Sequence, residues 1–275
     1  MHCKNCELTL QTHHNFCHSC GAKVIRKRLT FKALFSHFIE QYVNYDNKFL
    51  QTFLHLFSQP ENVIGVYING TRKKYVNVIS YFALALTISG IQLYILTKYF
   101  PGVMDLSSIT VAGQEEMANK NLQFVQEYQS VIMLFYVPIY ALMSRTVFFN
   151  DKKFNYTEHL VIFMYILAQV SLVSAILTVI CAFFGVTIGT ISIITMPLQV
   201  IYSAYCLKRL YSLNLSGILI RTLLFLVVLL IMFVIASVVM AIIMYLNGDM
   251  QEMMENKRAN QQALGNFFIH KLNFI

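Results

Sequence analysis

Charge is scarce in this sequence. Of its 275 residues, 12% are charged and 57% are hydrophobic, and the mean hydropathy is +0.57. A soluble domain usually has about a quarter of its residues charged. The shortage of charge therefore excludes an ordinary soluble domain and indicates a membrane protein, an inference strengthened by the stretch 159–207, which has no Asp, Glu, Lys or Arg.

Several signals are also missing. The first residues are polar and rich in cysteine, without the basic segment and apolar run of a cleavable signal peptide, so we expect the N-terminus to be retained. No Ser-His-Asp pattern, phosphate-binding loop or HExxH motif is present. We therefore predict that the protein is not an enzyme.

Long uncharged stretches predict five transmembrane helices, because a bilayer core requires about 20 mainly apolar residues per helix. The second stretch is the shortest, and it reaches adequate length if Arg145 extends its charged end to the interface. The stretch 159–207 is too long for one crossing and suits two antiparallel crossings. The predicted spans are roughly 78–96, 128–144, a pair joined by a turn at 183–189, and 223–245.

The distribution of Lys and Arg predicts the orientation. Segments 1–77, 145–159 and 207–221 together contain sixteen basic and six acidic residues, whereas segment 98–130 and the tail after residue 246 contain five and seven. The positive-inside rule then places the N-terminus in the cytoplasm, and five crossings place the C-terminus on the other side. Most of the net charge of +8 has this explanation, so no nucleic-acid partner is expected.

Four cysteines form two tight pairs at the N-terminus, Cys3-x2-Cys6 and Cys17-x2-Cys20. The reducing cytoplasm disfavours disulfides, and four thiolates on two short turns predict a tetrahedral Zn²⁺ site. An iron-sulfur cluster is the alternative. Nearby histidines are interpreted as solvated loop residues, namely His2, His13, His14 and His18. Because about 20 residues cannot form a core, the metal would supply the folding energy of this zinc ribbon.

An amphipathic region follows the ribbon, with apolar residues mostly at three- and four-residue steps between Phe31 and Phe57. Ser58 is expected to cap a helix that starts near Pro60 and ends at Gly70. The region lies either on anionic lipid of the inner leaflet or against the spans. The basic residues predicted to contact lipid head groups or a partner are Arg26, Lys27, Arg28, Lys32, Arg72, Lys73 and Lys74.

The double CxxC, the segment "LTFKALFSHFIEQYVNYDNKFLQTFLHLFSQP" and the segment "YINGTRKKYVN" together resemble an uncharacterised family of bacterial membrane proteins, a domain-of-unknown-function group with an N-terminal zinc ribbon. The resemblance covers about the first hundred residues and implies a topology and a ribbon but no activity. With the positive-inside rule, it predicts the bacterial cytoplasmic (inner) membrane.

The predicted fold class is an all-α polytopic membrane protein of about five transmembrane helices, with a small N-terminal zinc ribbon and amphipathic cytoplasmic helices. The predicted domains are the ribbon at 1–24, the amphipathic region at 25–76, the transmembrane domain at 77–246 and an extracytoplasmic tail at 247–275.

The leading functional hypothesis is a scaffold, sensor or partner-binding protein. The alternative is a channel or transporter for a small or lipophilic solute, alone or as a homo-oligomer. Ionisable residues are absent from the depth of the predicted spans, so this alternative depends on polar residues. Its candidate site consists of Gln92, Gln169 and Gln199, which interhelical hydrogen bonding also explains.

Overall fold

In a computed structural model of the chain, the described residues are 2–11, 13–22, 24, 30, 48–104 and 124–247. The chain divides into two compact units, Met1–Leu50 and Gln51–Ile275. Residues 31–47 of the predicted amphipathic region and residues 248–275 of the predicted tail lie outside the described residues, as do Arg26, Lys27, Arg28 and Lys32.

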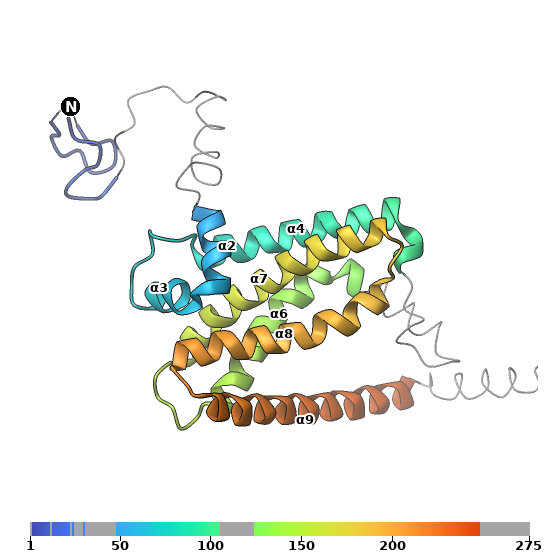
Figure 1. Cartoon of the computed structure of the whole chain (residues 1–275). Coiled ribbons are helices and arrows are strands. Elements are labelled where there is room, and N and C mark those ends of the chain that lie inside the picture. Colours follow the sequence, from blue (N-terminus) through green and yellow to red (C-terminus); the bar gives the residue numbers. More distant parts are fainter. Residues whose placement is uncertain are drawn as a thin grey trace, which may run out of the picture. The chain divides into compact units, whose positions relative to one another are not determined.

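Five helices of the described residues are long and apolar enough to cross a membrane, which confirms the predicted number (Figure 1). The short turn is also confirmed, because one helix ends at Phe183 and the next begins at Ile188, with Gly185 between them at φ +70°. The helices are α4 (Val78–Tyr99), α6 (Gln129–Val147), α7 (Tyr156–Phe183), α8 (Ile188–Tyr211) and α9 (Leu215–Asn247).

Polar side chains begin several of these helices. The Asn155 side chain accepts a hydrogen bond from the Glu158 N–H, and the Glu158 carboxylate accepts one from the Asn155 N–H. These two bonds form a capping box at the start of α7. Asn214 caps α9 by accepting a bond from the Gly217 N–H at 2.8 Å. Each cap satisfies backbone donors that a helix leaves unpaired in its first turn.

Helix α7 is the centre of the second unit. It lies beside α4 and also packs on α6 and α8 (Figure 1). Half of the residues in its most apolar stretch are buried, a larger share than in any other of the five spans. The buried side chains of α7 include Ile162, Phe163, Tyr165, Ile166, Leu167, Ala168 and Leu172.

Three short helical segments cover one end of the bundle. They are α2 (Lys48–Ser58), a π-helical turn η1 (Glu61–Gly65) and α3 (Val66–Ile68). We call this end, where α4, α7 and α9 begin and α6 and α8 end, the α2 end. Buried Leu56 and Ile64 pack inward, whereas Leu50, Leu54 and Phe57 of α2 are exposed.

The sequence was right that a helical segment begins near Pro60 and ends at Gly70, and wrong about its cap. Gly70 has φ +96° after α3, with bonds from the Gly70 N–H to Tyr67 O and from the Thr71 N–H to Val66 O, a Schellman motif. Ser58 does not cap the following helix. Its hydroxyl donates to Leu54 O at 3.2 Å, because α2 continues through Ser58.

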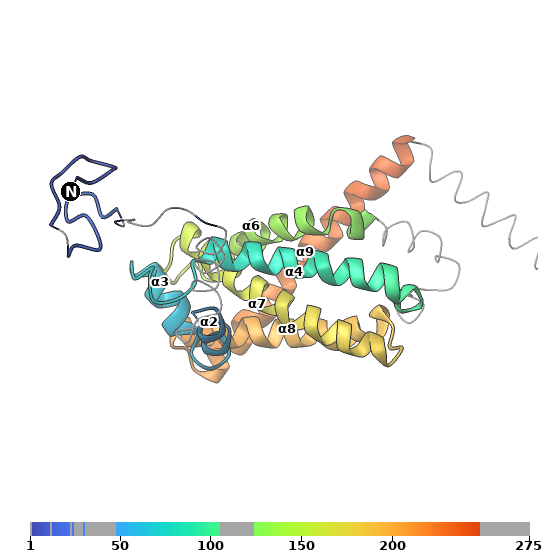
Figure 2. The same ribbon diagram turned by 90° about the horizontal axis from the view of Figure 1, so that it is seen from above.

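Helix α9 differs from the predicted fifth span and from the other helices. It begins at Leu215, earlier than the predicted start at 223, and so includes Arg221 in its second turn. It packs on α6 and α8, but no residue in its most apolar stretch is buried. Figure 2 shows its C-terminal part leaving the other spans.

The opposite end has a small core of its own. A 3-10 turn at Pro101–Met104 (η2) follows α4, and its Val103 packs with Leu96 of α4 and Ala182 of α7. Phe100 and Phe183 meet edge to face, with ring centroids 5.1 Å apart. This contact joins the end of α4 to the turn between α7 and α8.

Candidate functional site

Two backbone turns of the first unit repeat the same hydrogen-bond pattern. In the first turn the Cys3 N–H donates to Leu8 O and the Glu7 N–H to Cys3 O, at 2.9 and 2.8 Å. In the second turn the Cys17 N–H donates to Ala22 O and the Gly21 N–H to Cys17 O, both at 2.9 Å. The two CxxC motifs therefore form matching knuckles.

The residue after the second cysteine of each knuckle has a left-handed backbone conformation. Gly21 has φ +69° and Glu7 has φ +59°. Glycine adopts this conformation readily, whereas other residues adopt it at a cost. The strained position of Glu7 indicates that the knuckle geometry outweighs the local preference of this residue.

The two knuckles bring the four cysteines together. All four Sγ atoms lie within 4.8 Å of one another, and the pairs Cys3–Cys20 and Cys6–Cys17 are 3.6 and 3.5 Å apart. Bonds of 2.3 Å to a tetrahedral Zn²⁺ correspond to sulfur separations of about 3.8 Å. The set can therefore hold one tetrahedral ion with little movement.

The thiols differ in acidity because their hydrogen-bond partners differ. The Asn5 side chain, followed by the Ala22 N–H, lowers the pKa of Cys20 to about 6. The N–H groups of Asn5 and Cys6 lower the pKa of Cys3. The Leu8 N–H lowers the pKa of Cys6, but the thiols of Cys20 and Cys17 outweigh it and raise that pKa to about 12. Donors that favour thiolates favour metal binding as well.

Apolar side chains of this unit are divided between its interior and its surface. Leu10 is buried with Cys3 and Cys17 in a minimal core. Phe16, next to Cys17, is 58% exposed, and Leu8 is also exposed. The described histidines do not belong to the four-sulfur group. The His14 ring contacts the rings of His13 and His18, and the His2 ring hydrogen-bonds Glu7 O.

In the second unit, Gln169 holds three helices together. Its side-chain carbonyl accepts a hydrogen bond from the Tyr81 hydroxyl of α4, and its amide donates to Phe53 O of α2 at 3.1 Å. Gln169 is fully buried on α7. Its carboxamide thus satisfies polar groups of neighbouring helices, which is the interhelical bonding that the sequence allowed.

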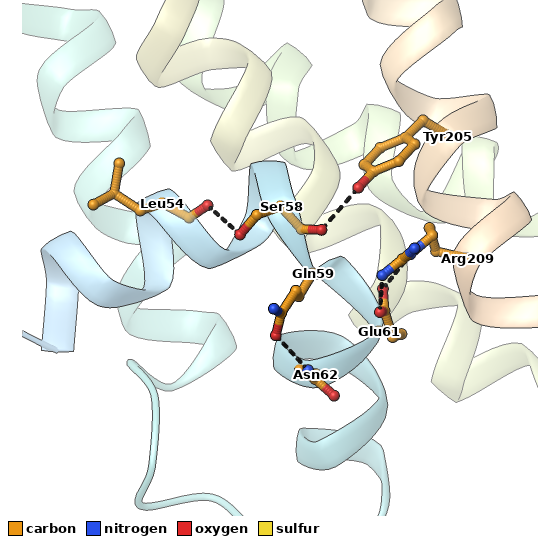
Figure 3. Close-up of polar contacts among 7 residues, drawn as sticks. All are labelled: Leu54, Ser58, Gln59, Glu61, Asn62, Tyr205 and Arg209. Carbon is orange, nitrogen blue, oxygen red and sulfur yellow. Dashed lines mark hydrogen bonds and ion pairs between the residues drawn. The ribbon is translucent and has the colours of Figure 1, made fainter.

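Helix α8 holds the α2 segment from the other side (Figure 3). The hydroxyls of Tyr202 and Tyr205 donate to Leu56 O and Ser58 O, both at 3.0 Å. Arg209 forms a two-pronged ion pair with Glu61, in which its Nε lies 2.9 Å from a carboxylate oxygen. The Arg209 guanidinium lowers the pKa of the Glu61 carboxyl.

The other predicted site residues are dispersed. Arg72, Lys73 and Lys74 are exposed in the segment between α3 and α4 at the α2 end. Gln169 and Gln199 line one cavity of about 400 Å³ between α7 and α8. Gln92 lies on α4 and is not among the residues that line this cavity.

Two polar contacts of the α2 end were not predicted. Arg221 of α9 pairs with Asp151, and its guanidinium lies 4.8 Å from the Phe148 ring centroid. His159 of α7 is fully buried, and its Nε2 lies 3.1 Å from the Tyr211 hydroxyl. Both contacts join residues far apart in the chain, so sequence periodicity contains no signal for them.

Comparison with known proteins gives one family match. Residues 46–90 match the model of the family described as "Protein of unknown function (DUF3667)". This region includes α2, η1, α3 and the first half of α4, the segment held by Gln169, Tyr202, Tyr205 and Arg209. No curated protein and no solved structure matches the chain.

Proposed function

We propose that the protein is a non-enzymatic membrane scaffold or sensor whose N-terminal unit binds one Zn²⁺ ion and a protein partner. The observation that carries the proposal is the convergence of Cys3, Cys6, Cys17 and Cys20 within 4.8 Å. Bound to four thiolates, Zn²⁺ supplies folding energy and has no open position for a substrate. The ribbon is therefore assigned a binding role.

Exposed apolar side chains support the partner-binding role. Among the described residues of this unit, the small core consists of Leu10, Cys3 and Cys17 with Ala22 and Val24 packed against it, and Phe16 is 58% exposed. Large aromatic side chains are enriched at the centres of protein interfaces. Phe16 is the proposed contact residue because it adjoins Cys17, and the metal would fix its position.

The proposed setting is the bacterial cytoplasmic membrane with the N-terminus inside. Arg72, Lys73 and Lys74 are exposed at the α2 end, whereas Glu61, Asp151 and Glu158 at that end are engaged in ion pairs or a helix cap. Exposed cations of this kind are attracted to anionic lipid head groups by about 1 kcal/mol each. Arg26, Lys27, Arg28 and Lys32 are proposed to add to this attraction.

Crosslinking in native membranes tests the partner-binding role. We compare the wild type, Phe16→Ser, Cys17→Ser and the membrane-domain control Cys181→Ser, and measure metal content on the same samples. We expect Phe16→Ser to keep zinc and lose specific crosslinked partners, and Cys17→Ser to lose both. Partners that persist in both ribbon variants at wild-type yield would contradict the proposal.

A channel or transporter is the alternative function. It requires a binding site for the solute in the membrane domain, and the cavity that Gln169 and Gln199 line is the place where such a site would lie. The side-chain carbonyl and one amide hydrogen of Gln169 already bond Tyr81 and Phe53 O. Most solute contacts would therefore depend on the other polar residues of this cavity.

A further inference from the structure

The cavity between α7 and α8 has two side chains with unused hydrogen-bonding groups. Neither the Gln199 carboxamide nor the Ser174 hydroxyl makes a hydrogen bond with any described residue. Both residues are partly buried. The Gln199 amide has two donors and an acceptor, and the Ser174 hydroxyl can donate and accept.

The two groups lie at a similar depth in the bundle. Helices α7 and α8 are antiparallel and joined by a short turn. Ser174 is nine residues before the end of α7 at Phe183, and Gln199 is eleven residues after the start of α8 at Ile188. At about 1.5 Å per residue, the difference in depth is on the order of 3 Å. Both therefore lie well inside their spans.

An unpaired amide or hydroxyl is costly at this depth, because lipid tails offer no hydrogen bonds. The remaining polar side chains of the cavity are already engaged. Tyr202 and Tyr205 donate to α2, Gln169 bonds Tyr81 and Phe53, and the Thr195 hydroxyl lies 3.5 Å from Ser192 O. Ser174 and Gln199 are thus the available partners for a molecule in the cavity.

The chemistry of the lining defines the class of molecule. Among the described residues, no Asp, Glu, Lys, Arg or His lines this cavity, so a charged ligand would find no counter-ion among them. Most of the lining is apolar, formed by residues that include Val170, Val173, Leu177, Leu198 and Ile201. A volume of about 400 Å³ is within the range of small-molecule sites.

We infer that the α7–α8 cavity binds an uncharged lipophilic molecule that bears a hydroxyl or carbonyl group, held by hydrogen bonds to Gln199 and Ser174. The apolar part of the molecule packs on the aliphatic lining, and its polar group pairs with the two side chains that the fold leaves unpaired. The inference does not depend on the zinc ribbon.

Photolabelling of the full-length protein in lipid nanodiscs tests the inference. The probe is a long-chain aliphatic alcohol that carries a diazirine and an alkyne, and the matched probe has hydrogen in place of the hydroxyl. We expect saturable labelling of α7 and α8 peptides by the alcohol and roughly fivefold weaker labelling by the matched probe, the effect of one lost hydrogen bond.

Three variants locate the site. Gln199→Leu and Ser174→Ala are each expected to reduce saturable labelling about fivefold, whereas Gln92→Leu, on α4, leaves it unchanged. Each variant is accepted only if its melting temperature matches that of the wild type. Since leucine suits a lipid environment better than an unpaired amide, Gln199→Leu is expected to fold.

Three results would overturn the inference. Labelling that does not saturate, or that is spread over exposed α9, would show simple partitioning into lipid. Equal labelling of Gln199→Leu and the wild type would mean that the amide is satisfied otherwise, for example by water in the 70 Å³ cavity that Gln199 also borders. Loss of self-association in Gln199→Leu, without a change in labelling, would mean that the amide contacts a second copy of the chain.

Discussion

The Tyr81 hydroxyl of α4 donates a hydrogen bond to the side chain of Gln169 of α7, and the same carboxamide donates to Phe53 O of α2. One buried side chain of α7 thereby bonds two parts, α2 and α4, of the segment that matches a family of unknown function. The bonds satisfy every group of this carboxamide except one amide hydrogen. Gln169 is thus placed as a structural residue of the α2 end.

We predict that Gln169→Leu lowers the stability of the membrane domain by about 1–3 kcal/mol, because it removes the hydrogen bonds to the buried Tyr81 hydroxyl and to Phe53 O. Thermal unfolding in nanodiscs measures the loss, and Gln92→Leu is the control on a partly buried α4 position. A double-mutant cycle with Tyr81→Phe should give a coupling of about 0.6–1.7 kcal/mol. Zero coupling would mean that the Tyr81–Gln169 bond does not contribute to stability.

The Glu61–Arg209 pair predicts a pH-dependent attachment of the α2 segment. The Arg209 guanidinium lowers the folded-state pKa of Glu61 below its ordinary value of 4.5. The pair therefore stabilises the fold at pH values above 4.5, and this contribution is lost as the pH falls through the lowered pKa.

We expect Glu61→Gln to destabilise the α2 segment by about 1 kcal/mol at pH 7, since the pair is partly exposed. Hydrogen exchange of peptides from α2 and η1 measures the effect, and the exposed Glu127→Gln is the control. The difference between wild type and Glu61→Gln should shrink below pH 4.5. A difference that stays constant down to acidic pH would rule out the ion pair as its source.

Substitutions at the left-handed positions of the two matching knuckles are expected to have different effects on zinc binding. Gly21→Ala should weaken zinc binding about fivefold, because a side chain at φ +69° costs about 1 kcal/mol. Glu7→Gly removes the same strain at φ +59° from the folded state, and the greater flexibility of glycine in the unfolded chain cancels part of this gain. It should therefore bind zinc at least as tightly as the wild type. Chelator competition with full-length protein measures both variants, and a weaker Glu7→Gly than Gly21→Ala would contradict the matched knuckle geometry.

The buried His159–Tyr211 contact gives a fourth prediction. Tyr211→Phe removes the partner of His159 Nε2, and the described residues provide none for His159 Nδ1. We expect a loss of about 1–3 kcal/mol in thermal stability, the usual cost of an unsatisfied buried group. Tyr156→Phe, at an exposed position of the same end, should have little effect. A stable Tyr211→Phe would show that His159 gains another partner.

The spans were predictable because hydropathy is a local property. The turn between α7 and α8 was found where Gly185 interrupts a long uncharged stretch, and the end of α6 at Val147 places Arg145 in its last turn as expected. The start of α9 was missed because Arg221 was treated as a boundary. Its pairing with Asp151 and its stacking on Phe148 allow the helix to begin before it.

The polar contacts were not predictable because they depend on tertiary structure. The sequence does not distinguish Gln92, Gln169 and Gln199 from one another. In the structure, Gln169 is the one of the three that is buried in an interhelical network, and Gln199 lines a cavity. The cysteine cluster is different. Two short turns fix its geometry locally, so the spacing of the cysteines was enough to predict that all four lie together.

Metal analysis of the purified full-length protein tests the central claim most directly. We predict one zinc per chain in the wild type and in Cys181→Ser, and none in Cys20→Ser, with insertion of the spans unchanged. Iron with inorganic sulfide in the wild type, or zinc retained in Cys20→Ser, would contradict the four-thiolate zinc site.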